Sequence, residues 1–578
     1  MAALASLTVW AQLLYFRFFN DLASSAAFLA TRQTADLGSS VAALATPKDL
    51  WLVIDLLIAI PLLWFGVRSH PARARRLQRL TPVALLLLAL PALATGARAV
   101  GDGRLQGRRN LQNLRSVSRH GLYGFQVFDA AARAVDGWKQ SEASDAELDR
   151  VVDWFVETAA TRRPAGPMAG IGTGRNLIAI QVESMQGFVL DLEINGQVVT
   201  PNLRRMRRRA LDFSLVLDQT HRGRSSAGDF VAMTSLLPVG ESIAYEYPRN
   251  EYFALGHAMS ERGYRTLSAI PYKKHFWNRR VTHAAYGFDT NLFRESFERK
   301  GPRVGWGIND QDFLRQMLPI LKSAQHPFFA WLTTLSLHYP YESFPDELET
   351  LELGDLEDTA LGNYLHGMNF FDLAFGEFVQ QLEMDGLLNQ TVIAIWGDHS
   401  SGLNRNHEYV EYFDLKTPVE KFLFRRVPFL IWLPGAQSAS GRHQMPAGQV
   451  DIAPTLLSVM GADPSTGAFL GRNLLGEQPG HRAVHPQGRW MDADLIYLSQ
   501  FADGSDSCFR TSDLARTQPR LCQAGTERAN AELDLVDEIL RNDLQAKVSG
   551  RLRSLLPPRG AVETVPDEPD LVDVAERP

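Results

Sequence analysis

The chain has 578 residues, 45% of them hydrophobic and 21% charged, which is enough apolar material for several buried cores and excludes a globally disordered protein. A formal net charge of −6 offers no basic surface for nucleic acid, so we expect no nucleic-acid partner. The two cysteines, Cys508 and Cys522, are too few for a disulfide-rich scaffold or a cysteine-based metal module.

The first hundred residues differ in composition from the rest of the chain. They contain no Glu, four Asp and nine Lys or Arg, a low charge density that is typical of membrane segments. A span needs about 20 apolar residues, which predicts spans at Leu50–Val67 and Leu80–Ala97 and a partial one at Met1–Phe16. Buried core helices are the alternative. We expect residues 1–100 to form a membrane region.

Charge bias predicts the orientation of this region. The segment Arg68–Leu80 holds five arginines in thirteen residues, so the positive-inside rule places it in the cytoplasm. The following helix then leaves the cytoplasm, and the chain beyond about residue 100 lies outside it. Arginines on the far side, such as Arg98 and Arg104, oppose this bias, but long domains cross largely regardless of charge.

The remaining chain divides into three predicted parts. Residues 101–172 read as a helical linker, because Ser144 and Glu147 form a capping-box pattern ahead of apolar residues at helical spacing. Residues 173–556 read as a catalytic domain. The tail 557–578 is rich in Pro, Asp and Glu without periodicity, and we expect it to be disordered.

Four short apolar runs within the catalytic domain predict its fold. They are bounded by polar, Gly or Pro residues and separated by helical patterns: Asn176–Val182, Phe328–Leu335, Thr391–Trp396 and Val427–Leu433. Such runs indicate an α/β domain with a mostly parallel sheet covered by helices on both faces. In open α/β sheets ligands bind beyond the carboxyl ends of the strands.

Polar residues follow three of these runs directly. Glu183 follows the first run, His338 closely follows the second, and Asp398 and His399 follow the third. Carboxylate oxygens with imidazole nitrogens suit a divalent ion such as zinc or manganese. Strand ends are also polar simply because they are exposed, so the prediction of a metal site depends on the group rather than on any one residue.

A candidate nucleophile lies between the first two runs, in the glycine-containing segment His221–Phe230. Ser225 is expected at a turn that opens a helix, where backbone N–H groups favour an anionic phosphoryl group. Coordination to a divalent cation would lower the pKa of its hydroxyl. Ser226 is adjacent, so the register of the nucleophile stays open by one residue.

Five motifs in this order resemble the lipoteichoic acid synthases, which belong to the alkaline phosphatase and sulfatase superfamily. The resemblance covers about residues 173–475 and the layout of a membrane region followed by an outer domain. The motifs are Val-Glu183-Ser, Gly-Arg-Ser225-Ser-Ala-Gly-Asp, His275-Phe-Trp-Asn-Arg279, Leu-His338-Tyr-Pro and Gly-Asp398-His399.

The resemblance implies a role for each matching position. Glu183, Asp398, His399 and Ser225 match the ligands of one divalent metal, with manganese the usual ion and magnesium or zinc the alternatives. Ser225 also matches the nucleophile. The residues that match the surroundings of the glycerol phosphate are Trp277, Arg279 and His338.

The implied activity is phosphoglycerol transfer through a covalent seryl intermediate. The expected donor is a phosphatidylglycerol-like membrane lipid, and the expected acceptor is a glycan or a glycerol phosphate polymer of the envelope. Two features depart from the family pattern. The family usually has Thr where this chain has Ser225, and it typically has five membrane helices, so the two clear spans suggest a shortened start.

Other functions remain open from the sequence. A two-metal phosphatase or phosphodiesterase needs further ligands, for which His407, Asp310 and His443 are available. A phosphoethanolamine transferase shares the layout, and an inactive envelope scaffold is the alternative from another class. A formylglycine sulfatase is disfavoured, because residues 173–556 contain no Cys/Ser-x-Pro-x-Arg motif.

The two cysteines lie fourteen positions apart in the domain that we place outside the cytoplasm. Disulfides persist in oxidising compartments, and residues 518–525 can supply the turn between them. We therefore expect a Cys508–Cys522 disulfide, although two free thiols would give the same sequence pattern.

The orientation can be tested with compartment-sensitive reporters. We predict that fusions after residue 75 and after residue 120 report opposite compartments, because the arginine-rich segment stays in the cytoplasm. Reporter activity in intact cells measures this. Equal signals from the two fusions would contradict the predicted orientation.

Overall fold

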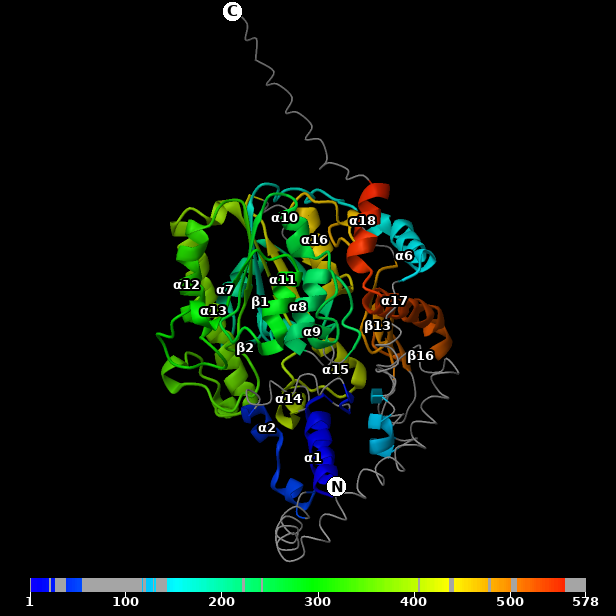
Figure 1. Cartoon of the computed structure of the whole chain (residues 1–578). Helices are drawn as coiled ribbons and strands as arrows, with labels where there is room; N and C mark the ends of the chain where they lie inside the picture. Colours follow the sequence, from blue (N-terminus) through cyan, green and yellow to red (C-terminus); the bar gives the residue numbers. More distant parts are fainter. Residues whose placement is uncertain are drawn as a thin grey trace, which may run out of the picture.

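The computed structural model describes residues 2–19, 22–25, 38–52, 54, 117, 121–127, 129–130, 143–220, 224–240, 243–403, 406–435, 441–476, 480–499 and 507–556. Most of these residues form an α/β body that begins near residue 143 (Figure 1).

Helices α1 (Ala2–Phe19) and α2 (Gly38–Leu44) lie in the N-terminal region. In the described part of the chain, no helix combines the length and the apolar character that crossing a bilayer requires. The predicted spans 50–67 and 80–97, the arginine-rich segment 68–80 and the tail 557–578 lie almost wholly outside the described residues, so they stay predictions.

A nine-stranded sheet forms the centre of the body, with the order β10-β4-β9-β8-β1-β7-β5-β6 and with β11 paired to β4. Its strands are β1 (Asn176–Val182), β4 (Ala210–Leu217), β5 (Arg265–Ala269), β6 (Thr290–Leu292), β7 (Phe328–Thr333), β8 (Thr391–Gly397), β9 (Val427–Trp432), β10 (Gly441–His443) and β11 (Ala447–Gly448). A separate short hairpin pairs β2 (Glu193–Ile194) with β3 (Gln197–Val198).

The predicted mostly parallel sheet is confirmed, with one correction. All four apolar runs are strands, and the pairings of β1 with β7 and β8 are parallel. The fourth run, β9, is antiparallel to both β4 and β8. A continuous apolar run shows that a strand is buried on both faces but carries no information on its direction. The sequence therefore predicted the strand and not its polarity.

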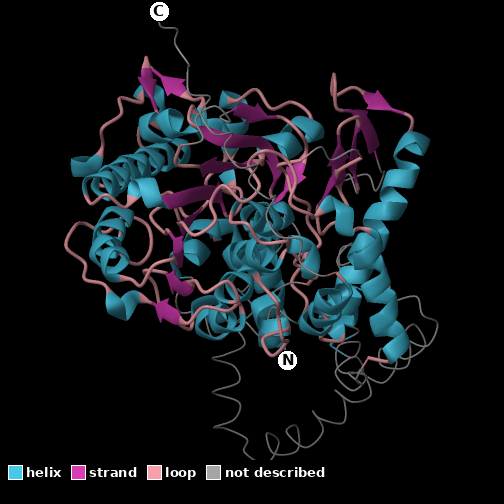
Figure 2. Ribbon diagram, turned by 90° about the horizontal axis from the view of Figure 1, so that it is seen from above, coloured by secondary structure: helices cyan, strands magenta, loops and turns pink. Residues whose placement is uncertain are grey.

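Helices cover both faces of the sheet, and the side chains of β1 alternate between the two resulting cores. Leu177 and Ala179 join one core, and Ile178 and Ile180 join the other. The first face carries α8 (Arg224–Thr234), α10 (Leu255–Ser260) and α16 (Ile452–Val459), and the second carries α7 (Pro201–Arg207), α12 (Asp310–Ser323) and α13 (Ala360–Met384). Figure 2 shows the strands between the two layers of helices. Shorter helices lie in the connections: α9 (Ile243–Glu246), α11 (Arg279–Ala285), α14 (His407–Tyr412) and α15 (Pro418–Phe424).

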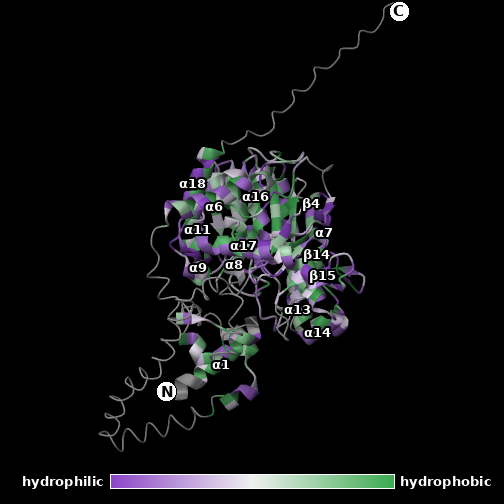
Figure 3. Ribbon diagram, turned by 90° about the vertical axis from the view of Figure 1, so that its right-hand side faces the viewer, coloured by the Kyte–Doolittle hydropathy of each residue, from purple (hydrophilic) through white to green (hydrophobic). Residues whose placement is uncertain are grey.

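A second, five-stranded antiparallel sheet follows the main sheet in the chain. It is built from β12 (Arg482–Val484), β13 (Trp490–Asp492), β14 (Leu495–Leu498), β15 (Ser507–Arg510) and β16 (Arg516–Thr517). Helices α17 (Gln523–Arg541) and α18 (Gln545–Leu555) come next. In Figure 3, α17 carries both hydrophilic and hydrophobic residues, and its Val536 and Ile539 are buried in the first core. The expected Cys508–Cys522 disulfide is confirmed and joins β15 to the turn before α17.

The predicted helix in the linker is also confirmed, as α6 (Asp145–Glu157). The Ser144 Oγ accepts from the Glu147 backbone N–H, and the Glu147 carboxylate accepts from the Ser144 backbone N–H, which completes the capping box. Val152 and Phe155 are buried in the first core, and α6 packs beside α18 (Figure 1). This part of the linker is therefore packed into the catalytic body.

Asp372 on α13 fastens the start of α7 to the second face. Its carboxylate accepts from the backbone N–H groups of Asn202 (2.9 Å) and Leu203 (2.7 Å). We predict that Asp372→Ala lowers the free energy of unfolding by about 1–3 kcal/mol, because these N–H groups lose their acceptor. Asp372→Asn keeps an acceptor oxygen and should lose less. Urea denaturation measures both variants, and an unchanged transition in Asp372→Ala would contradict the prediction.

Candidate active site

The candidate site lies where β1 and β8 end side by side. The two strands are parallel and in register, with Val182 opposite Gly397, so Glu183 and Asp398 follow at neighbouring positions. Gly397 permits this approach, because a Cβ on it would lie 1.9 Å from the Met185 carbonyl oxygen. The sequence-predicted group is thus brought together at the expected edge of the sheet.

Glu183, Asp398 and His399 form a group that could hold a metal ion, with one ligand atom from each residue and all these atoms within 4.8 Å of one another. All three side chains are buried. The His399 Nε2 lies 3.3 Å from both Glu183 Oε1 and Asp398 Oδ2, and the Asp398 Oδ2 has no hydrogen-bond partner in the described structure. A buried carboxylate oxygen without a donor, beside a second carboxylate and an imidazole, fits a divalent cation.

Ser184 connects the two carboxylates and was not predicted from the sequence as part of the site. Its backbone N–H donates to Asp398 Oδ1 (2.7 Å), and its hydroxyl donates to Glu183 Oε1 (2.8 Å). Its φ of 56° lies in the left-handed region, which a non-glycine residue adopts at a cost of about 1–3 kcal/mol. Sequence gives no signal for this backbone conformation.

The two carboxylates perturb each other's protonation. Burial raises the pKa of Glu183, but the nearby charge of His399 and the hydrogen bond from Ser184 outweigh it and hold that pKa below its ordinary value. Burial, together with the charge of Glu183, raises the pKa of Asp398 well above its ordinary value. Two buried carboxylates this close do not both ionise readily without a counter-charge, which a cation would supply.

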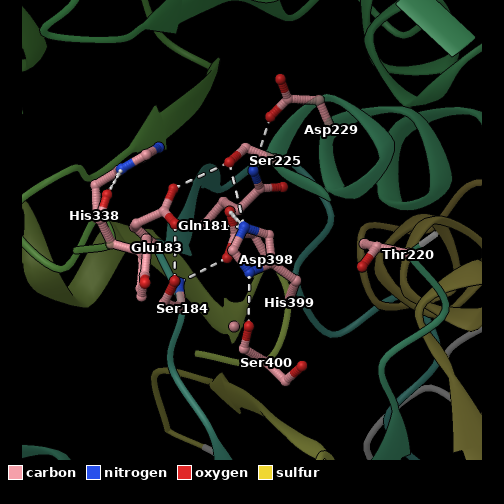
Figure 4. A network of polar contacts seen from close by, with 12 residues as sticks. Gln181, Glu183, Ser184, Thr220, Ser225, Asp229, His338, Asp398, His399 and Ser400 are labelled. Carbon is pink, nitrogen blue, oxygen red and sulfur yellow. Dashed lines mark hydrogen bonds and ion pairs between the residues drawn. The ribbon is translucent and has the colours of Figure 1, made fainter. Parts of the chain in front are cut away.

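Ser225 faces this group from α8 (Figure 4). Its Oγ donates to Glu183 Oε2 (3.1 Å) and lies 3.2 Å from His399 Nε2. Gly228 brings the helix close to β8, since a Cβ on it would lie 3.0 Å from the Asp398 carbonyl oxygen. The structure therefore places the hydroxyl of Ser225 against the predicted metal ligands, as the motif alignment anticipated.

Arg279 is held beside the site by Asp229, one helical turn after Ser225 on α8. The Arg279 Nε donates to Asp229 Oδ2 (2.8 Å), and the Gln181 Nε2 donates to Asp229 Oδ1 (2.7 Å). The Nη2 of Arg279 is buried and has no hydrogen-bond partner in the described structure. The role of Asp229 was not predicted, although its four-residue spacing from Ser225 places both side chains on one helix face.

The Asp229 carboxylate stays ionised in this arrangement. Burial alone would raise its pKa, but the charge of Arg279 and the hydrogen bond from His283 hold it well below its ordinary value. Asp229 is therefore a fixed negative charge that orients the guanidinium of Arg279.

Trp277 lies in a tight turn immediately before α11. Trp277 and Asn278 both have left-handed backbone conformations, with φ of 53° and 54°. The Asn278 side chain donates to the Ala244 carbonyl oxygen (3.0 Å), which stabilises the turn. The Trp277 ring is half-buried and contacts the ring of Phe276, and no described contact joins it to Ser225.

His338 lies beside Glu183 (Figure 4). Its ring stacks on Trp306 with the centroids 3.8 Å apart, and its Nδ1 lies 2.6 Å from the Tyr339 carbonyl oxygen. This contact and the stacking on Trp306 fix the orientation of the ring. Trp306 was not predicted as a supporting residue, because it is distant in sequence from every motif.

The residues considered for a second metal site do not join this group. Asp310 is buried at the start of α12, where its Oδ1 accepts from the backbone N–H groups of Leu335 and Ser336, and burial raises its pKa to about 6. The His407 side chain is 91% exposed, and His443 stacks on Phe213. Asp310 thus braces the segment that leads to His338, and the structure places no second ligand set from these residues beside the first.

Two family models match the chain. Residues 1–142 match the lipoteichoic acid synthase N-terminal domain, and residues 175–462 match the sulfatase model, which includes every residue of the group around Ser225. The chain belongs to the lipoteichoic acid synthase family of the alkaline phosphatase and sulfatase superfamily. The resemblance inferred from the five motifs is therefore confirmed.

Curated relatives of this family match over most of their length. The chain is 26% identical over 543 residues to a lipoteichoic acid synthase-like protein of Bacillus subtilis, covering 92% of this chain and 85% of that protein. It is 26% identical over 553 residues to the lipoteichoic acid synthase of Staphylococcus aureus, covering 94% and 83%.

Solved structures share the superfamily fold. The lipoteichoic acid synthase LtaP of Listeria monocytogenes aligns with a TM-score of 0.56 at 20% identity, covering 69% of this chain and 98% of that one. An alkaline phosphatase superfamily protein of Vibrio parahaemolyticus aligns with the same TM-score at 19% identity, covering 70% and 98%.

The metal ligands can be tested by metal content. We predict that Asp398→Ala abolishes stoichiometric binding of manganese, because it removes one of two buried carboxylates that face the cation position. His407→Ala is the matched control and should bind the ion as the wild-type protein does, since its side chain is exposed. Elemental analysis after desalting gives the stoichiometry. A full complement of metal in Asp398→Ala would refute the assignment.

Proposed function

We propose that this protein is a phosphoglycerol transferase that moves glycerol phosphate from a phosphatidylglycerol-like lipid to an envelope glycan or polymer acceptor. The observation that carries the proposal is the position of Ser225, whose Oγ lies within 3.2 Å of both Glu183 Oε2 and His399 Nε2. The unpartnered Nη2 of Arg279 adds a cationic donor for phosphate oxygens in the same region.

Glu183, Asp398, His399 and Ser225 would hold one divalent ion, for which we propose manganese, with magnesium or zinc as alternatives. When bound, such an ion lowers the pKa of a coordinated hydroxyl and neutralises charge on a phosphoryl group. Membership of the superfamily and the buried donor set support this proposal.

The chain's own residues account for two transfer steps. In the first, the Ser225 oxygen attacks the phosphorus of the lipid, the bond to diacylglycerol breaks, and the serine proton ends on the departing oxygen. In the second, an acceptor hydroxyl attacks the same phosphorus, and Ser225 leaves with the acceptor's proton. We assign His338 to carry these protons and Arg279 to bind the phosphoryl oxygens.

The remaining proposed contacts concern the glycerol unit and the compartment. Trp277 precedes Arg279 in the turn before α11 and matches the family residues around the glycerol phosphate, so we assign it to the glycerol side of the substrate. The Cys508–Cys522 disulfide is typical of oxidising compartments, which supports a catalytic domain outside the cytoplasm, anchored at the membrane by residues 1–100.

A covalent intermediate is the direct test of this proposal. Incubation of the purified protein with phosphatidylglycerol and manganese should add one glycerophosphoryl group to the intact mass. We predict that Ser225→Ala abolishes this adduct and lowers turnover by about 10³-fold or more, whereas Ser225→Thr retains activity because the attacking hydroxyl is kept.

Ser226→Ala is the matched control, because it removes the adjacent hydroxyl of α8 and should leave turnover measurable. Peptide mapping of the adduct identifies the labelled residue, and a label on Ser226 would overturn the assignment. Release of glycerol phosphate without an adduct would favour the phosphodiesterase alternative. Labelling by phosphatidylethanolamine instead would favour the phosphoethanolamine transferase.

A further inference from the structure

A cavity of about 210 Å³ lies between α6, the segment after α16, and α17. None of the residues assigned to the Ser225 site lines it. Its walls carry two carboxylates, Asp451 and Glu532, and four arginines, Arg162, Arg472, Arg482 and Arg528. Positive side chains therefore outnumber negative ones around this cavity.

Arg162 is the central observation. Its side chain is fully buried, its Nη1 donates to Thr158 Oγ1 (2.9 Å), and its Nη2 donates to the Phe155 carbonyl oxygen. Its Nε has no hydrogen-bond partner, and no carboxylate within the described residues forms an ion pair with it. Burial and the nearby charge of Arg472 lower the pKa of Arg162 to about 9, against an opposing effect of Asp463. Buried arginines are normally paired, whereas this guanidinium has no carboxylate in direct contact among the described residues.

The two carboxylates of the cavity do not supply that anion. Asp451 is already engaged, because it accepts from His481 Nε2 (2.9 Å) and from the backbone N–H groups of Gly448 (2.8 Å) and Arg472 (2.7 Å). Glu532 forms no ion pair with the lining arginines in the part of the chain that the structure describes, and burial raises its pKa to about 7.

A second unpartnered donor points to the same conclusion. Arg482 pairs through Nη2 with Asp492 (2.9 Å), but its Nε is buried and has no partner in the described structure. Two guanidinium groups of the cavity wall thus each keep an unsatisfied N–H donor, which is buried within the wall. Guanidinium forks match the oxygens of phosphate in geometry as well as in charge.

We propose that this cavity binds the phosphate group of a small organic phosphate, separately from the Ser225 site. The volume is enough for several water-sized groups, each taking about 30 Å³. Trp154, Leu237 and Leu470 give the wall an apolar part that suits a short carbon chain. The proposal does not depend on the chemistry assigned to Ser225.

Two glutamines connect the cavity to the candidate active site. Gln219 lines the cavity, and its backbone N–H donates to Gln449 Oε1 (2.9 Å). The Gln449 Nε2 in turn donates to the backbone carbonyl oxygen of Asp398 (2.7 Å). An anion in the cavity therefore lies within a short hydrogen-bonded path of a predicted metal ligand.

Equilibrium dialysis of the full-length protein against radiolabelled glycerol phosphate, and separately against inorganic phosphate, tests the proposal. Arg472→Gln and Arg528→Gln are the informative variants. Arg528 is exposed and Arg472 is half-buried, so their replacement should disturb folding less than replacement of the fully buried Arg162. Arg520→Gln, exposed before α17, is the control of equal charge. We expect the wild-type protein and the Arg520→Gln control to show two classes of glycerol phosphate site. In each informative variant, the affinity of one class should be about tenfold weaker.

Glycerophosphoryl labelling of Ser225 should survive in both informative variants, so failure of that labelling in every protein would count against the proposed function alone. Equal binding of glycerol phosphate by all four proteins would overturn the cavity site. Binding of inorganic phosphate but not of glycerol phosphate at the second class would overturn its assignment to an organic phosphate.

Discussion

The close approach of two buried carboxylates, Glu183 and Asp398, is the constraint on which the site depends. β1 and β8 are parallel neighbours, and each is followed directly by an acid, so the two carboxylates lie close together. Gly397 permits this approach because it has no Cβ to obstruct it. Like charges this close repel each other strongly in a buried setting. The Ser184 N–H group and the His399 ring offset part of this repulsion, and a cation held by Glu183, Asp398 and His399 would offset the rest.

A second acid on the next helix organises the other half of the site. Asp229 is held by Gln181 from β1, and it orients Arg279 from α11. The sheet, α8 and α11 are thus joined through one carboxylate, and Ser225 lies one helical turn from it. The Ser225 hydroxyl, the predicted metal ligands and the Arg279 guanidinium are positioned together, so displacement of α8 would move the hydroxyl and the guanidinium at once.

The sequence predicted those features that follow from local pattern. The apolar runs predicted β1, β7, β8 and β9. Glu183, Asp398 and His399 were predicted as site residues because they directly follow strands, and parallel strands bring their carboxyl ends to one edge. The direction of β9, the left-handed turn at Ser184 and the stacking of Trp306 on His338 depend on contacts between distant segments. The contact of the Ser225 hydroxyl with Glu183 also depends on the placement of α8 against β8, which no single-residue pattern contains.

The packing of α6 has a consequence for how the catalytic body can be cut from the rest of the chain. Phe155 fills the same core as α18, and Arg150 forms an ion pair with Glu538 on α17. A fragment that starts at residue 173 would lack α6 and would expose the apolar surface of α18 that α6 covers, which would favour aggregation. The smallest self-contained enzyme begins ahead of Ser144, and a protease that sheds this body intact must cleave upstream of that serine.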